Sequence, residues 1–491
     1  MHTRNIPVMM LCTLIACAGA SAKDAAKYTA AAAAQLCNGT FSNGVKINPT
    51  AAAYMADVGY IDKTTPVIKV DSQSVCDVHT FAWNQFLYYT QNDASTGKPR
   101  FMLLAPWYNT LTSGAKPGPY PGGPTDLRTS NLDQTQAGDD DKLMDTAGKL
   151  VSYDIRFDIN MYQSIVLQNY FSEAGFKAAC NPDPKNQGVC LNNLKMWMSP
   201  SGANEHPEPG SIEMKTSWRD FGTAAACPSS QFHCQGRFGL VGLHYVNKTF
   251  SHGEWVWASF EHIANTPDCA PGGDAPIAPQ SPINSSWSFF DPSKAPASVM
   301  SSKRCNVASN PPQCNNDPNP SGDKKTWKQV NVCRTYQIPA GGASPANCAV
   351  GATANSEGNV ACLNASIAPT RTGAWKNYRL IGAVWTAGGM GPNQDFRIKG
   401  YQSPVPGIPF ATPVGVVQLA NTTMETWLQR GATGYDPFKT NASQAGCFLC
   451  HNQPSAYGNA GRQVDMSHFP GKLPPAKLEA FKKRLVGAGE K

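Results

Sequence analysis

The sequence predicts an α+β fold: a large, loop-rich domain with a mostly antiparallel sheet and several disulfides, followed by a small helical segment at the C-terminus. Three observations predict it. Several runs of β-branched and aromatic residues alternate with a period of two, which is typical of strands. An aromatic-rich run with helical spacing precedes most of them. Between the runs, 43 Gly and 39 Pro provide long connections, and 16 cysteines provide cross-links.

Residues 1–22 have the pattern of a secretory signal peptide. Arg4 precedes an apolar stretch, Ile6–Ala16, that is too short to cross a bilayer of about 30 Å. Ala20-Ser21-Ala22 would allow simple cleavage, whereas Leu14–Cys17 resembles a lipoprotein box that would leave a lipid anchor on Cys17. We therefore expect a periplasmic or secreted protein, or an outer-membrane lipoprotein. No later apolar run is long enough to predict a transmembrane segment.

The large domain is predicted to span residues 23–415. It should open with an alanine-rich helix over residues 23–37. Residues 76–90 then predict a helix with a bulky aromatic face. Residues 105–124 are rich in proline and glycine and predict a loop. In residues 151–157, alternate apolar side chains predict a strand.

The middle of the chain is expected to form most of the sheet. Residues 211–218, 237–250 and 254–263 predict strands, the last two joined as a hairpin. Residues 266–325 lack periodicity and predict an irregular, disulfide-linked excursion. A further strand over residues 378–385 is expected to return to the sheet.

The predicted strand 254–263 should present two different faces. Phe260 and its alternate neighbours are expected on one face, and Ser259 and Glu261 on the other. Several metal-ligand types cluster on this hairpin, although their spacing matches no metal motif. They are His244, His252, Glu254, Glu261 and His262.

Most of the cysteines are expected to form about six disulfides, because an exported, loop-rich chain commonly uses them to restrain its loops. Cys12 and Cys17 fall in the leader, and two more belong to the motif described next. Close pairs such as Cys180/Cys190 and Cys227/Cys234 could form local bridges, but the sequence does not determine the connectivity. The twelve are Cys37, Cys76, Cys180, Cys190, Cys227, Cys234, Cys269, Cys305, Cys314, Cys333, Cys348 and Cys362.

The chemistry-bearing motif is Cys447-Phe448-Leu449-Cys450-His451. This C-x-x-C-H pattern resembles the haem attachment site of the c-type cytochromes. The resemblance implies one covalent haem c, with thioether bonds from Cys447 and Cys450 and with His451 as the proximal iron ligand. A disulfide between the two cysteines is the structural alternative.

The surroundings of the motif, residues 416–491, resemble a shortened cytochrome c domain. Asn421-Thr422-Thr423 can cap a helix over residues 424–430. Pro474-Pro475 can open a closing helix that runs to Gly487. The resemblance covers only this segment, and the large domain resembles no family that we can name.

The sequence does not determine the distal ligand of the haem iron. Met466 and His468 follow the motif closely and could each bind the iron if the loop doubles back. The ligand could instead come from the large domain, where the candidates are His244, His252 and His262. An open or water-bound iron is the fourth alternative.

The expected function depends on whether the distal position of the iron is occupied by a protein ligand. Two strong axial ligands favour one-electron transfer with a redox partner protein, and an open position favours a haem-dependent oxidoreductase. A secreted binding protein with a structural or sensory haem is a third hypothesis. The sequence therefore leaves open whether the protein is an enzyme. The net charge of +7 is small for 491 residues and shows no basic stripe, so nucleic acid is not an expected partner.

Overall fold

A computed structural model of the chain describes seventeen stretches, some of them single residues, that come from most parts of the sequence. They are residues 36–41, 44–52, 75–106, 116–123, 143–167, 169, 171–172, 211–220, 238–247, 255–268, 286–293, 332, 334, 348, 356–386, 413–415 and 421–423.

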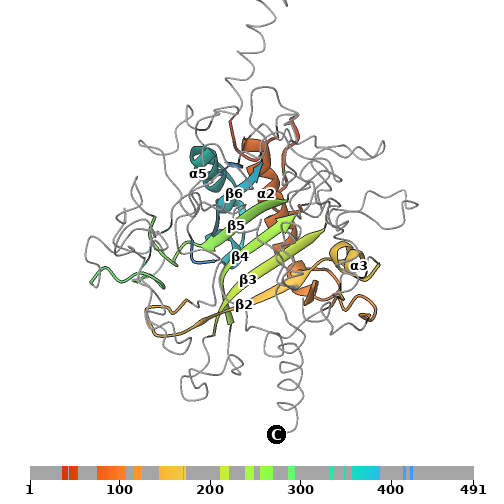
Figure 1. Ribbon diagram of the computed structural model, residues 1–491. Coiled ribbons are helices and arrows are strands. Elements are labelled where there is room, and N and C mark those ends of the chain that lie inside the picture. The colour runs from red at the N-terminus through yellow and green to blue at the C-terminus, as the bar shows by residue number, and fades with distance from the viewer. Residues whose placement is uncertain are drawn as a thin grey trace, which may run out of the picture.

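The centre of the molecule is an antiparallel sheet whose strands lie side by side in chain order (Figure 1). Every described strand pair is antiparallel, so the predicted mostly antiparallel sheet is confirmed. The strands are β1 (Ala105–Pro106), β2 (Val151–Phe157), β3 (Ile212–Asp220), β4 (Phe238–Asn247), β5 (Val256–His262), β6 (Tyr378–Thr386) and β7 (Pro413–Gly415).

The register of the sheet shifts at two points. Between Ser217 and Trp218 of β3, the partner on β4 moves from Gly242 to Leu240, so that β4 carries one extra residue. A similar shift places one extra residue on β6 opposite β5. Such bulges bend a strand and increase its twist. Regular alternation resumes at Gly242, which therefore shares a face with the residue two positions further along β4.

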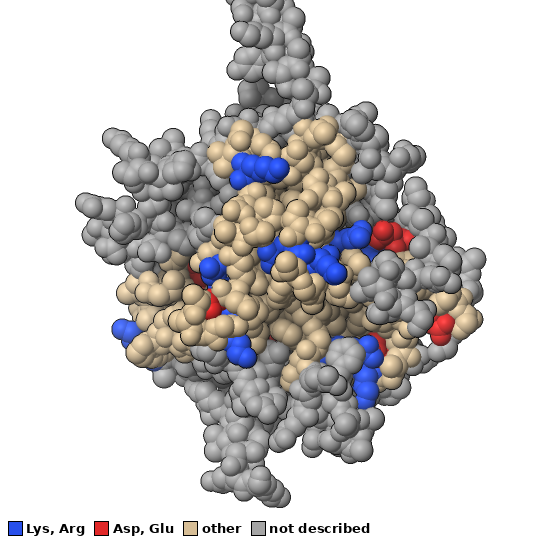
Figure 2. Space-filling view, turned by 180° about the vertical axis from the view of Figure 1, so that it is seen from behind, with Lys and Arg blue, Asp and Glu red and all other residues tan. Residues whose placement is uncertain are grey.

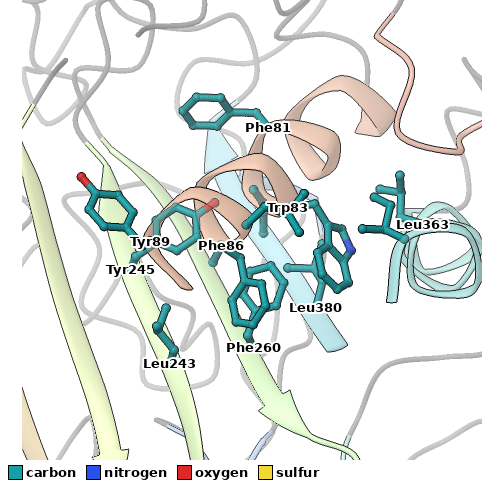
Figure 3. Packing of buried hydrophobic residues seen from close by; sticks show 14 of the residues in the cluster. Phe81, Trp83, Phe86, Tyr89, Leu243, Tyr245, Phe260, Leu363 and Leu380 are labelled. Atoms are coloured by element: carbon teal, nitrogen blue, oxygen red, sulfur yellow. The ribbon is translucent and has the colours of Figure 1, made fainter. Parts of the chain in front are cut away.

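Helix α2 (Val75–Thr90) confirms the predicted helix over residues 76–90. Its aromatic side chains pack on the sheet, as Figure 3 shows: the Phe86 ring stacks 4.2 Å from that of Phe260, and the Trp83 ring lies edge-on at 5.0 Å. The buried surface of α2 also extends beyond the predicted aromatic face. Within α2 only Val75 and Tyr88 are not fully buried, because neighbouring segments cover the helix on its other sides too.

Two further helices were not predicted. Helix α5 (Ser356–Ile367) packs against both α2 and β6, and Leu363 contributes to the same core (Figures 1 and 3). The Asn364 amide holds α5 to β6: its Nδ2 donates to the Leu380 carbonyl at 2.8 Å, and its Oδ1 accepts from the Leu380 N–H at 3.0 Å. Helix α3 (Ile159–Leu167) follows β2 directly and contacts β2 and β3.

Two disulfides lie beside α2 and α5, which confirms part of the predicted cross-linking. Cys37 bonds to Cys76 in the first turn of α2, and Cys348 bonds to Cys362 in α5. The Cys37 N–H also donates to the Cys348 carbonyl at 2.6 Å, which brings the two bridges together. The suggested pairs Cys180/Cys190 and Cys227/Cys234 lie outside the described residues.

The remaining predicted segments are only partly described. Leu36 and Cys37 are not helical, although residues 23–37 were expected to form a helix, whose other residues lie outside the described part. Residues 116–123 are irregular, as expected of a loop, and so are residues 286–293 of the predicted excursion. Among the described helices, none is long and apolar enough to cross a bilayer.

Candidate functional site

The predicted haem-attachment residues fall outside the part of the chain that the structure describes. They are Cys447, Cys450 and His451, together with the distal candidates Met466, His468 and His252. The structure does describe Asn421–Thr423, the residues that lead into the predicted C-terminal helix, and two of the large domain's histidine candidates, His244 and His262. The geometry around these residues is the basis of the candidate site.

Residues 421–423 are fixed to the sheet by hydrogen bonds. The Thr422 N–H donates to Glu261 Oε2 at 2.8 Å, and the Thr423 hydroxyl donates to the Phe260 carbonyl at 2.8 Å. Asn265 Nδ2 also donates to the Thr422 hydroxyl at 2.8 Å. All of these residues are buried. The segment that precedes the predicted haem motif is therefore anchored on β5.

Asn421 makes the hydrogen bond expected at the start of a helix. Its Oδ1 accepts from the Thr423 N–H at 2.8 Å. An N-cap side chain characteristically accepts from the second or third residue that follows. The geometry fits the predicted capping role of these three residues, while the predicted helix 424–430 itself lies outside the described part.

The anchor is backed by a charge cluster in which Arg334 and Glu261 are buried and Asp268 is partly exposed. Arg334 Nη1 lies 3.4 Å from Glu261 Oε1, and Arg334 Nε lies 2.7 Å from Asp268 Oδ1. Arg334 Nη2 donates to the carbonyls of Ile263, at 3.1 Å, and of Thr266. Burial raises the pKa of Glu261, while Arg334 and the Thr422 N–H oppose the rise. The cluster holds the Glu261 carboxyl, and through it Thr422, in one position.

Gly242 on β4 allows this close approach. A Cβ atom at this position would collide with the Thr423 hydroxyl oxygen and with the Phe260 carbonyl oxygen. The face of β4 from which that Cβ would project is therefore the face on which Thr423 lies. We call the side of the sheet marked by Gly242, Glu261 and Thr423 the anchor face.

A row of polar side chains crosses the anchor face beside Thr423. Lys215, His244 and Ser259 are paired in register across β3, β4 and β5. His244 follows Gly242 by two residues, and Ser259 precedes Glu261 by two, so both share the face of those residues. His244 Nδ1 lies 2.8 Å from the Ser259 hydroxyl oxygen. The three side chains are buried.

The opposite face of the sheet is apolar. Leu243, Tyr245 and Phe260 belong to the core that α2 covers. Figure 3 shows these side chains on the same side as the α2 aromatics. The predicted division of the strand 254–263, with Phe260 on one face and Glu261 on the other, agrees with these contacts. One face of the sheet thus builds the larger core, and the other holds the anchor together with a smaller buried cluster that includes Val151 and Tyr153.

The three described histidines occupy different environments. His79 lies in α2, with its ring 5.6 Å from that of Trp385, and burial lowers its pKa to about 3. His262 ends β5, with its ring 5.1 Å from that of Tyr378; burial and then the Arg334 charge lower its pKa to about 4. Of the three, His244 is the one on the anchor face. Sequence reasoning did not single out His79, because nothing in a helical aromatic run marks one position as wholly enclosed.

The described members of the hairpin group that could bind a metal, His244, Glu261 and His262, do not form a common site. Glu261 is committed to Arg334 and Thr422, whereas His244 pairs with Ser259. Among the described residues there is no group of three or more His, Cys, Asp or Glu side chains that could hold a metal ion. His252 and Glu254 lie outside those residues.

Surface charge and comparison with known proteins are the remaining sources of information on the site. On the face shown in Figure 2, the described Lys and Arg side chains form separate patches. No protein family, curated protein or solved structure matches the chain.

Proposed function

We propose that this protein is an exported mono-haem c-type cytochrome that transfers single electrons in the periplasm. The observation that carries the proposal is the motif Cys447-Phe448-Leu449-Cys450-His451. Two thiols at this spacing suit thioether bonds to one porphyrin, and the adjacent imidazole suits the proximal position on its iron. The haem would supply the one-electron chemistry when bound.

The structure supports the compartment that this proposal needs. The disulfides Cys37–Cys76 and Cys348–Cys362 are expected of a protein that folds under oxidising conditions, outside the cytoplasm. The predicted signal peptide points in the same direction. The two bridges use four cysteines outside the motif, in keeping with separate roles for the two sets of thiols.

The anchor suggests how the large domain would serve this function. Thr422 and Thr423, near the start of the proposed haem segment (residues 416–491), hold the chain on the sheet. A haem segment fixed at that end would be held against a rigid, cross-linked body. The large domain would then shield the haem and present a surface to a redox partner protein.

The first test is whether the mature chain carries covalent haem. We would export the full chain in a bacterial host that assembles c-type cytochromes and would measure haem by the pyridine haemochrome assay and by intact mass. We expect one haem per chain, and we expect its loss in Cys447→Ser/Cys450→Ser. The matched control, Phe448→Leu/Leu449→Val, should keep it. A colourless wild type with Cys447 bonded to Cys450 would overturn the proposal.

The second test separates the electron carrier from the other two hypotheses. A six-coordinate carrier should show absorption spectra that change little when carbon monoxide or cyanide is added. A rapid and complete spectral shift would contradict the carrier and indicate an oxidoreductase with an open iron. A haem that cannot be reduced at accessible potentials would also contradict it and indicate a structural or sensory role.

A further inference from the structure

We infer that the surface at the C-terminal end of α2 binds an acidic face of a partner protein. Two segments form this surface: residues 91–103, which follow α2, and residues 368–377, which precede β6. We call it the basic surface. The inference does not depend on the proposed haem, because every residue that it uses belongs to the described part of the large domain.

Two arginines bring the segments together at the end of α2. Arg100 Nη1 donates to the Tyr88 carbonyl at 3.0 Å and to Gln91 Oε1 at 2.9 Å. Arg371 Nη2 donates to the Thr90 hydroxyl oxygen at 3.3 Å. Helix α2 has no basic residue of its own in its last turn. The helix dipole favours positive charge there, which accounts for the two guanidinium groups but not for the exposed lysines beside them.

Aromatic side chains fix the two segments to α2 and to each other. The Trp375 ring lies edge-on to those of Phe86, at 6.0 Å, and Phe101, at 6.3 Å. The guanidinium carbon of Arg100 lies 4.3 Å from the centre of the Tyr88 ring. Tyr88 and Trp375 pack against the core and are only partly buried. Arginine, tyrosine and tryptophan are among the residue types enriched at the centres of protein interfaces.

The basic surface carries four cations that form no ion pair with any described residue. They are Lys98, Arg100, Arg371 and Lys376. The two lysines are exposed, and the two arginines are partly buried. Arg156, Arg219 and Arg334, in contrast, each contact a carboxylate. A group of unpaired cations at the surface favours association with a surface of opposite charge.

The chemistry of the basic surface favours a protein partner over a membrane. The hydrogen bonds of Arg100 use only Nη1, so its Nε–Nη2 edge can bind a carboxylate through two parallel hydrogen bonds. Asp93 is the only acid in the two segments, and its Oδ1 already accepts from the N–H groups of Ser95 and Thr96, both at 3.0 Å. Membrane-binding surfaces add exposed apolar side chains. The large apolar residues that the structure describes as exposed lie outside these segments: Leu36, Ile159 and Leu167.

The test measures the binding of fluorescent poly-L-glutamate, a minimal acidic polypeptide, to the full chain by fluorescence anisotropy at low ionic strength. We expect Lys98→Glu/Lys376→Glu to weaken binding by about tenfold. The matched control Lys116→Glu/Lys149→Glu makes the same change in net charge outside the two segments and should weaken binding less than about threefold. Arg100→Lys keeps the charge but loses the planar donor edge, and it should also weaken binding. Thermal unfolding of each variant checks that the fold is retained.

Equal losses in the two double variants would overturn the inference, because they would show a response to total charge and not to this surface. A wild type that does not bind poly-L-glutamate would also overturn it. If that wild type instead binds vesicles of equimolar phosphatidylcholine and phosphatidylglycerol, and Lys98→Glu/Lys376→Glu does not, the surface binds a membrane. A wild type without haem that still binds poly-L-glutamate through this surface would overturn only the proposed function.

Discussion

His79 shows how one enclosed side chain can set the acid sensitivity of the whole molecule. Burial lowers its pKa to about 3, whereas an unfolded histidine titrates near 6.5. Below pH 6.5 the unfolded chain therefore binds a proton that the folded chain excludes. The contribution of neutral His79 to the free energy of unfolding is complete above pH 6.5, and it falls as the pH drops toward 3.

We predict that His79→Phe makes the protein less sensitive to acid. The variant keeps an aromatic ring beside Trp385 but removes the titrating group. Between pH 6.5 and 3, the wild type should lose up to about 1.4 kcal/mol per pH unit more than the variant. Denaturant unfolding at a series of pH values measures the difference. Parallel pH profiles for the two proteins would contradict the assignment.

Asp158 should have the opposite effect on the pH dependence of stability: the stability should fall as the pH rises. Its Oδ1 accepts from the Met161 N–H at 2.8 Å, as an N-cap of α3, and from the Ile212 N–H at 3.0 Å. Burial raises its pKa to about 7 although these donors oppose the rise. The folded state therefore keeps a proton that the unfolded state releases above about pH 4. The stability it contributes is complete below that pH and is lost as the pH rises through 7.

We predict that Asp158→Asn flattens the stability profile between pH 4 and 7, because asparagine is also a good N-cap and does not ionise. Asp158→Ala should instead cost about 0.5–2 kcal/mol at acidic pH through loss of the cap. Unfolding free energies at pH 4.5 and 7.5 for the three proteins provide the check. A wild type that is equally stable at both values, relative to Asp158→Asn, would refute the raised pKa.

At the scale of elements, α2 packs on the sheet through aromatic side chains, among them Trp83 and Phe86 against Phe260. We predict that Phe86→Ala destabilises the protein by about 3–5 kcal/mol, because it removes a ring stacked 4.2 Å from Phe260 and leaves a cavity. Leu167→Ala, at the exposed end of α3, is the control and should change stability by less than about 0.5 kcal/mol. Chemical denaturation compares them, and equal losses would contradict the core assignment.

The charge cluster behind the anchor gives a second prediction at this scale. Arg334→Met should cost about 3–5 kcal/mol, because it leaves Glu261 buried without its cation. Adding Glu261→Gln to that variant should recover part of the loss, since no charge then needs a partner in the interior. A double-mutant cycle by denaturant unfolding measures the recovery. Simple additivity of the two losses would show that the pair is not coupled.

The strands of the sheet could be predicted from the sequence, whereas helix α5 could not. Strands β2 to β6 were predictable because β-branched and aromatic residues alternate along them. Helix α5 was not, because its sequence, SEGNVACLNASI, contains Gly, Asn and Ser and shows no clear apolar stripe. Tertiary contacts with α2 and β6 stabilise α5 instead, and such contacts are not visible in a local pattern.

At the scale of the whole molecule, the disulfides should contribute unequally. Cys37 and Cys76 are 39 residues apart, and Cys348 and Cys362 are 14 apart. Closing the longer loop restricts the unfolded chain more. We predict that Cys37→Ala/Cys76→Ala costs about 4 kcal/mol and Cys348→Ala/Cys362→Ala about 3 kcal/mol. Thermal and denaturant unfolding of the oxidised variants give the comparison, and a reversed order would point to strain or residual structure.

The candidate site divides into a part that sequence can indicate and a part that it cannot. The C-x-x-C-H motif is local, so its five consecutive residues are sufficient to suggest the proposed haem attachment. The anchor depends on contacts between Thr422 and Glu261 and between Thr423 and Phe260, which are far apart along the chain. Only strand register brings His244 next to Ser259 and places both on the face that Thr423 occupies.

The order of the strands also bears on how the protein would be assembled. Each strand from β2 to β7 pairs with the strand that precedes it in the sequence. A chain that emerges from a translocation pore with its N-terminus first would therefore find each new strand's neighbour already present. Residues 421–423 would emerge after the complete sheet, onto a surface that is ready to receive them. If Cys447 and Cys450 bind haem as proposed, the site of attachment would emerge after the strands of the sheet.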